Sequence, residues 1–94
     1  MNSRADDKAM GKRKQITRAA LEQTIAEAVR ASRPECKDFV GVVVERVSPD
    51  KSGDPNWVVK GVRYGKANRD LCGEALSNCV AERQLEFELN DSAA

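Results

Sequence analysis

Between the valine-rich middle of the chain and its last predicted helix lies the segment RYGKANR, residues 63–69, which is rich in groups that attract anions. A helix is expected to begin just after Asn68, and a helix N-terminus combines free amides with the positive end of the helix dipole. Lys66 and Arg69 add full charges there, Gly65 permits a tight turn, and Tyr64 offers a ring for stacking a base or sugar. The predicted anion-binding residues are Arg63, Tyr64, Lys66, Asn68 and Arg69. The alternative is a strand-to-helix turn whose charges are only solvated.

The chain has three cysteines, Cys36, Cys72 and Cys79, and this odd number argues against a framework of disulfides. No secretory signal is visible at the N-terminus, so we expect reduced thiols in the cytoplasm. Cys72 and Cys79 would share one face of a helix, where a free cysteine usually packs as a small hydrophobic residue. A zinc site needs closely spaced pairs or a fourth ligand, and the sequence offers neither. We therefore predict core cysteines, with neither a metal nor a cofactor.

Most catalytic chemistry is disfavoured by the residue types. Histidine is absent, which removes the commonest general base and the commonest metal ligand. A nucleophilic Cys36 would have to rely on Lys37 or on a carboxylate for activation. The loop from Asp50 resembles the start of a calcium-binding loop, but Pro55 and Gly61 stand where an EF-hand needs glycine and glutamate. The sequence has neither a P-loop nor a dinucleotide-binding glycine motif, and we predict a protein that is not an enzyme.

The composition is that of one small globular domain. Of the 94 residues, 40% are hydrophobic and 33% are charged, and the net charge is +1. This balance excludes the uniformly basic chain that often marks a nucleic-acid binder, and no apolar run is long enough for a transmembrane helix. The charges are nevertheless separated: residues 1–34 are basic, whereas residues 70–94 carry Arg83 against six carboxylates. Either the acidic helix is simply solvated, or a basic surface faces an anionic partner while that helix faces away.

The first predicted element is a helix over residues 18–32. Thr17 is a suitable N-cap, and apolar residues follow at helical steps of three and four from Leu21 to Val29. Pro34 ends the helix because the residue before a proline avoids the α region. Residues 1–15 are polar and show neither helical nor strand periodicity, so we expect a disordered basic arm.

Two β-branched stretches predict an antiparallel hairpin. The first runs from Phe39 to Val47 and the second over residues 56–65, and turn-forming and charged residues join them. Strict alternation along the second strand places Trp57, Val59, Gly61 and Arg63 on one face and the residues between them on the other. Trp57 is either a residue at the edge of the core or an interface anchor.

A second helix is predicted to begin after Asn68, which is a good N-cap. Its apolar stripe includes Cys72, Leu76 and Cys79. We favour a helix that runs to about residue 87, with a short third strand over residues 84–89 as the alternative, because apolar and polar residues alternate there. Residues 90–94 are predicted to form a frayed tail.

The resulting element order, α-β-β-α, predicts a small two-layer α+β domain over residues 16–89. A lone hairpin is only marginally stable, so both helices should pack on one of its faces. The opposite face then stays open and carries several valines. Exposed apolar area of this kind favours self-association through that face or through a strand edge.

Two functions remain open. One is a small non-enzymatic interaction module that binds itself or another protein; the other is a nucleic-acid or phosphate-backbone binder that uses the basic arm and the 63–69 turn. Over residues 39–83 the chain resembles, in topology, the C-terminal half of a double-stranded-RNA-binding domain, where a lysine-rich helix start grips phosphates. Lys66 and Arg69 alone match that cluster, and the family's third strand is missing here, so the chain is not assigned to it. Neither a membrane nor a small-molecule substrate is implied.

Overall fold

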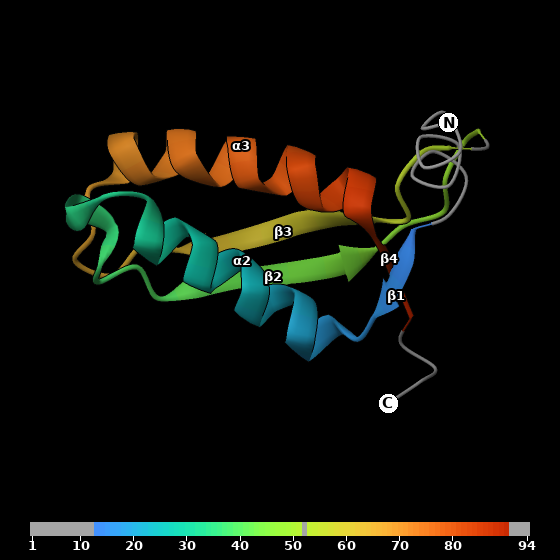
Figure 1. Cartoon of the computed structure of the whole chain (residues 1–94), viewed down its shortest axis with the longest axis horizontal. Coiled ribbons are helices and arrows are strands. Elements are labelled where there is room, and N and C mark those ends of the chain that lie inside the picture. Colours follow the sequence, from blue (N-terminus) through green and yellow to red (C-terminus); the bar gives the residue numbers. More distant parts are fainter. Residues whose placement is uncertain (1–12, 52, 91–94) are drawn as a thin grey trace, which may run out of the picture.

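The computed structural model describes residues 13–51 and 53–90, and it has the mixed α+β fold that the sequence predicts (Figure 1). Its elements are β1 (Lys14–Ile16), α2 (Arg18–Ser32), the short 3-10 helix η1 (Pro34–Cys36), β2 (Gly41–Arg46), β3 (Trp57–Arg63), α3 (Arg69–Glu86) and β4 (Phe87–Leu89). Within the described part of the chain, no helix is both long and apolar enough to cross a membrane.

Both helices begin at the predicted caps. The Thr17 hydroxyl accepts a hydrogen bond from the Ala20 amide at 3.3 Å, and the Asn68 side-chain oxygen accepts one from the Leu71 amide at 3.0 Å. Each side chain thereby satisfies an amide of the first turn that has no partner within the helix. The bounds of α2 are those predicted, and α3 ends one residue before the expected position.

The chain after α3 forms the short third strand, but this strand does not extend the hairpin. β4 pairs in parallel with β1, with Ile16 opposite Leu89, and makes a separate two-stranded sheet. Leu89 is only 2% exposed, and burial of this large apolar side chain offsets the entropy of ordering the segment. The predicted arm and tail are therefore too long: residues 13–15 and Asn90 belong to the folded part, and Asn90 donates to the Ile16 carbonyl at 2.8 Å. The rest of the arm and tail, residues 1–12 and 91–94, lies outside the described residues.

A buried asparagine joins the two sheets. The Asn56 side chain accepts from the Leu89 amide at 2.9 Å and donates to the Leu89 carbonyl at 3.0 Å. Next to it, the Trp57 indole donates to the Phe87 carbonyl at 3.2 Å. The backbone of β4 thus finds its partners in the start of β3, which fixes the end of α3 against the hairpin.

The hairpin is antiparallel as predicted, but a β-bulge interrupts its alternation. Val43 pairs with Gly61 and Val44 with Val59, which leaves Lys60 as an extra residue on β3. An extra residue reverses the facing of everything beyond it. Val62 and Tyr64 therefore join Trp57 and Val59 on the core side, and the strict alternation predicted along the second strand is wrong beyond Lys60.

Both helices pack on one face of the hairpin. The buried cluster combines Leu21, Ile25 and Val29 of α2, Cys72, Leu76 and Cys79 of α3, and Val42, Val44 and Trp57 of the hairpin. Trp57 is fully buried, so it is a core residue and not an exposed anchor. The predicted two-layer packing is confirmed, and the other face of the hairpin is left without a helix (Figure 1).

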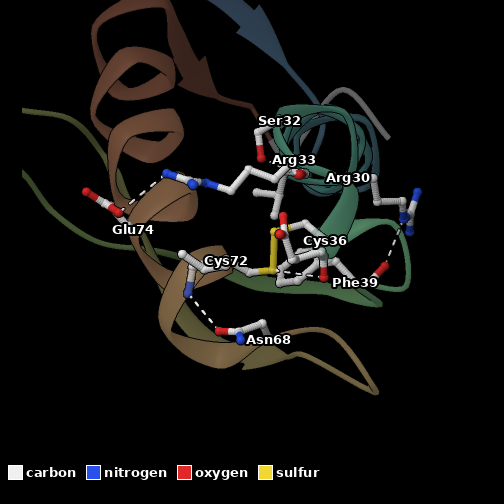
Figure 2. The surroundings of a disulfide bond; sticks show 11 residues. Arg30, Ser32, Arg33, Cys36, Phe39, Asn68, Cys72 and Glu74 are labelled. Carbon is white, nitrogen blue, oxygen red and sulfur yellow. Dashed lines mark hydrogen bonds and ion pairs between the residues drawn. A yellow bond between two sulfur atoms is a disulfide. The ribbon is translucent and has the colours of Figure 1, made fainter.

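The prediction of three reduced cysteines is wrong for two of them. Cys36 of η1 and Cys72 in the first turn of α3 form a disulfide, with their Cα atoms 5.7 Å apart (Figure 2). Both residues are fully buried, so the sequence predicted their burial but not their pairing. They meet because η1 turns the chain after α2 back towards the start of α3. Disulfides persist mainly in oxidising compartments, so the cysteine-based argument for a cytoplasmic location no longer holds.

Candidate interaction site

The open face of the hairpin carries two glycines and has one charged residue at each end. On this face Gly41, Val43 and Glu45 of β2 lie opposite Arg63, Gly61 and Val58 of β3, respectively. Val58 is 37% exposed, and a Cβ atom built on Gly41 would meet nothing within 4 Å. Glycines in a strand leave room for another backbone to approach closely. The surface is therefore a bare backbone strip with two valines, an acid at one end and a base at the other.

The edges of the hairpin are less suited to pairing than its face. On the outer edge of β2, the Glu22 carboxylate of α2 accepts from the Val44 amide at 2.8 Å. Farther along α2, Arg30 donates to the carbonyls of Phe39 and Val40 at 2.8 and 2.9 Å. On β3 the bulge and the exposed Lys60 act against strand addition. Pairing of two whole strands edge to edge is thus disfavoured on both sides, and on β2 only the short stretch between Val40 and Val44 is left for a shorter segment.

The chain makes the predicted tight turn at Gly65, within the segment in which anion binding is predicted. Its φ of 60° lies in the left-handed region, and the Ala67 amide donates to the Tyr64 carbonyl at 3.0 Å. A side chain there would be strained, since a Cβ would lie 2.7 Å from Val40 Cγ2 and 3.3 Å from the Asp38 carbonyl. Lys66 and Arg69 are exposed on this turn, close to the free amides of α3.

Three of the predicted anion-binding residues, Tyr64, Asn68 and Arg69, already have partners within the fold. The Arg69 guanidinium lies over the Tyr64 ring, 5.3 Å from its centroid, and the edge of Phe39 packs against the same ring at 5.8 Å. The Asn68 side-chain oxygen caps α3. Arg63 lies opposite Gly41 on the open face of the hairpin. The turn thus presents Lys66 and Arg69 as exposed charges, while Tyr64 and Asn68 stabilise the fold.

No family model matches this chain. No curated protein and no solved structure is significantly similar to it either. Its candidate sites therefore rest on its own residues.

A groove runs between α2 and the outer edge of β2, with a volume of about 470 Å³. Its walls are Glu22, Gln23, Ala26 and Arg30 of α2, the segment from Val40 to Val43, and Arg63. Glu22 and Arg30 lie outside the apolar positions that define the 18–32 helix in the sequence, and their bonds to the backbone of residues 39–44 were not predicted. No local pattern predicts them, because they depend on how α2 lies beside β2.

The free thiol of Cys79 lies in a shallow groove between α2 and α3, beside Ala28, Ser32 and Asn78. Burial raises its pKa above the usual value for a thiol; Arg83 opposes this rise and Glu82 adds to it. A raised pKa keeps the group protonated at neutral pH, and the thiol is a weak nucleophile and a poor metal ligand in that state. Its environment therefore favours the role of a core residue.

Proposed function

We propose that this protein is a small homotypic interaction module, in which two copies associate through the open faces of their hairpins. The observation that carries the proposal is the bare strip at Gly41 and Gly61, flanked by Val43 and Val58 and by opposite charges at its ends. Contiguous exposed apolar surface on a small domain often marks an interaction site. No residue with a catalytic role is part of this proposal.

The charges specify how two copies would meet. A two-fold axis in the plane of the face, perpendicular to the strands, reverses the strand direction of the second copy. Glu45 of one copy then approaches Arg63 of the other, twice in each dimer, while Val43 and Gly61 at the middle of the face meet the same two residues of the other copy. Gly41, the residue opposite Arg63, is four residues from Glu45 on β2. At the usual rise of a strand, the acidic and basic ends of the face are therefore about 13 Å apart. An axis parallel to the strands would instead bring like charges together.

The association should be weak and concentration-dependent. The bulge places Val62 in the core, so the open face carries Val43 and Val58, not the larger set that strict alternation predicts. A face of one hairpin buries less than the roughly 1,200 Å² of a stable specific interface. Dissociation constants in the high micromolar to millimolar range, about 4–6 kcal/mol, are therefore expected.

Sedimentation velocity over a concentration series tests this proposal. The wild-type chain should shift to larger sedimentation coefficients towards millimolar concentration. Val58→Lys should abolish the shift, because the new lysine beside Glu45 would approach the Arg63 of the other copy and repel it. Ser48→Thr in the exposed loop should leave the shift unchanged. A wild-type protein that stays monomeric at millimolar concentration contradicts the proposal.

The alternative is a phosphate-backbone binder, supported by the three exposed cations Arg63, Lys66 and Arg69 within one short segment. Titration of labelled duplex and single-stranded RNA and DNA at two salt concentrations distinguishes it from the module. Counterion release would give a steep salt slope, which should fall by about one unit for each phosphate that Lys66→Ala or Arg69→Ala leaves without its cation. No binding at low salt would rule out this alternative and leave the homotypic module.

We further propose that the module works with the Cys36–Cys72 disulfide formed. A reducing cytoplasm disfavours such a bond, so the proposal favours an oxidising compartment over the cytoplasmic location expected from the sequence.

A further inference from the structure

The groove between α2 and β2 has the dimensions and the backbone exposure of a site for an extended chain. Its volume, about 470 Å³, falls in the range of specific ligand sites. One wall is the outer edge of a strand, from Gly41 to Val43, and the other is the face of α2 around Ala26. The small Ala26 side chain leaves space between α2 and β2 at this point. A peptide could therefore lie beside the strand without displacing α2.

The backbone of β2 offers hydrogen-bonding groups towards this groove. The Val44 amide points away from β3, since it donates to the Glu22 carboxylate. In an antiparallel ladder every second residue points the same way, and no extra residue interrupts β2 between positions 42 and 44. The amide and carbonyl of Val42 therefore face the groove. Val42 lies between Val44, which Glu22 binds, and Val40, which Arg30 binds.

The side chains of the groove select for negative charge. Arg30 is held in place by its bonds to the Phe39 and Val40 carbonyls, of which Val40 also lines the groove (Figure 2 shows the bond to Phe39). Arg63 lines the groove as a second guanidinium. Glu22 keeps its own negative charge, but its carboxylate is bound to the Val44 amide, about two turns of α2 away from Arg30, so the two guanidiniums outnumber it. A guanidinium with fixed orientation is well suited to hold a carboxylate.

We propose that this groove binds an extended peptide segment by strand addition at Val42, with a carboxylate of the peptide held by Arg30 and Arg63. The peptide backbone supplies partners for the Val42 amide and carbonyl, as in other cases of β-augmentation. The length of free edge between Glu22 and Arg30 limits the contact to a short segment, so a terminal or near-terminal carboxylate fits best. This inference does not require self-association through the open face, but both use Arg63, so a bound carboxylate and a second copy would compete for it.

Titration by NMR in the Val58→Lys background tests the groove in a chain that stays monomeric. The probes are N-acetyl-Ala-Val-Ala with a free C-terminal carboxylate, the same peptide with a C-terminal amide, and acetate. The free acid should give saturable shifts at the Val42 amide and at the Arg30 and Arg63 side chains. The amide form should bind about tenfold more weakly, because one charge-assisted hydrogen bond contributes roughly that factor.

Arg63→Gln should weaken binding of the free acid by about tenfold, whereas Lys51→Gln, the same change of charge in the exposed loop, should not alter it. Equal binding of the acid and the amide would overturn the role of the carboxylate. Acetate that binds as tightly as the peptide would overturn the strand addition. The absence of saturable shifts at Val42 at probe concentrations on the order of 10 mM would overturn the site itself.

Discussion

Cys36 and Cys72 stand 36 positions apart in the sequence, and neither has a local pattern that points to the other. Their apolar surroundings are sufficient to predict that both are buried, because a cysteine on a helical stripe behaves as a small hydrophobic residue. Their pairing depends on the tertiary structure, because η1 must lie against the start of α3 for the two sulfur atoms to meet. Tyr64 and Asn68 show the same limit: their residue types suit ligand binding, but Arg69 and the helix cap already use them.

Loss of the disulfide should lower the free energy of unfolding by about 4 kcal/mol, because a closed loop of this length restricts the unfolded chain. Urea unfolding with and without reductant measures the effect. In the Cys36→Ala/Cys72→Ala variant the reductant should have no further effect. A wild-type midpoint that does not respond to reductant would contradict the structural role of the bond.

Gly65→Ala and Gly41→Ala form a matched pair. Gly65 has a φ of 60° and little space for a Cβ, so its replacement should destabilise the protein by about 1–2 kcal/mol. Gly41 has open space and ordinary backbone, so its replacement should be neutral or stabilising by up to about 1 kcal/mol. The urea midpoints of the two variants measure the difference. Equal losses of stability would contradict a left-handed conformation at Gly65.

The raised pKa of Cys79 predicts a loss of stability at alkaline pH. Burial keeps the folded thiol protonated where the unfolded thiol has already ionised, so the folded state binds more protons. This contribution of Cys79 to the free energy of unfolding is complete below the pKa of the unfolded thiol. It is lost as the pH rises through the pKa of the folded thiol. Unfolding free energies from pH 7 to 10 should therefore fall more steeply for the wild type than for Cys79→Ala. Parallel curves would indicate that the thiol is solvated.

At the scale of elements, the signals that predicted the fold correctly were local. Thr17, Asn68 and Pro34 mark helix ends by capping and by steric restriction, and α2 and α3 follow them within one residue. The bulge at Lys60 and the parallel pairing of β1 with β4 have no such signal, because each depends on which surface the strand meets. The bulge matters most for function, since it determines which valines the open face keeps.

Asn56→Ala tests the link between the hairpin and β4. The variant leaves the buried Leu89 amide without its partner and removes the Asn56 bond to the Leu89 carbonyl, which keeps only a long bond of 3.5 Å from Arg46. A cost of about 2–3 kcal/mol is expected in urea unfolding, because buried polar groups without partners carry a desolvation penalty. Asn78→Ala, on the exposed side of α3, should change stability by less than about 0.5 kcal/mol. If both variants lose the same amount, β4 does not dock through Asn56.

At the scale of the whole molecule, charge and apolar surface are arranged by face. The helices cover the core side of the hairpin, and the opposite side keeps its glycine strip between Glu45 and Arg63. From the sequence the open face and its valines could be expected, but not the positions of these two charges relative to one another. The positions of Glu45 and Arg63 depend on the register of the hairpin, including the bulge. This register places the acid and the base at opposite ends of the open face.

Sedimentation velocity of a charge-swap series tests the central claim, the antiparallel meeting of two open faces. Glu45→Arg and Arg63→Glu should each weaken self-association by about fivefold or more, because each places two like-charge pairs across the dimer. The double variant Glu45→Arg/Arg63→Glu should associate as the wild type does, since it restores both pairs with their signs exchanged. A double variant as weak as the single ones, or four proteins that associate equally, would contradict the account.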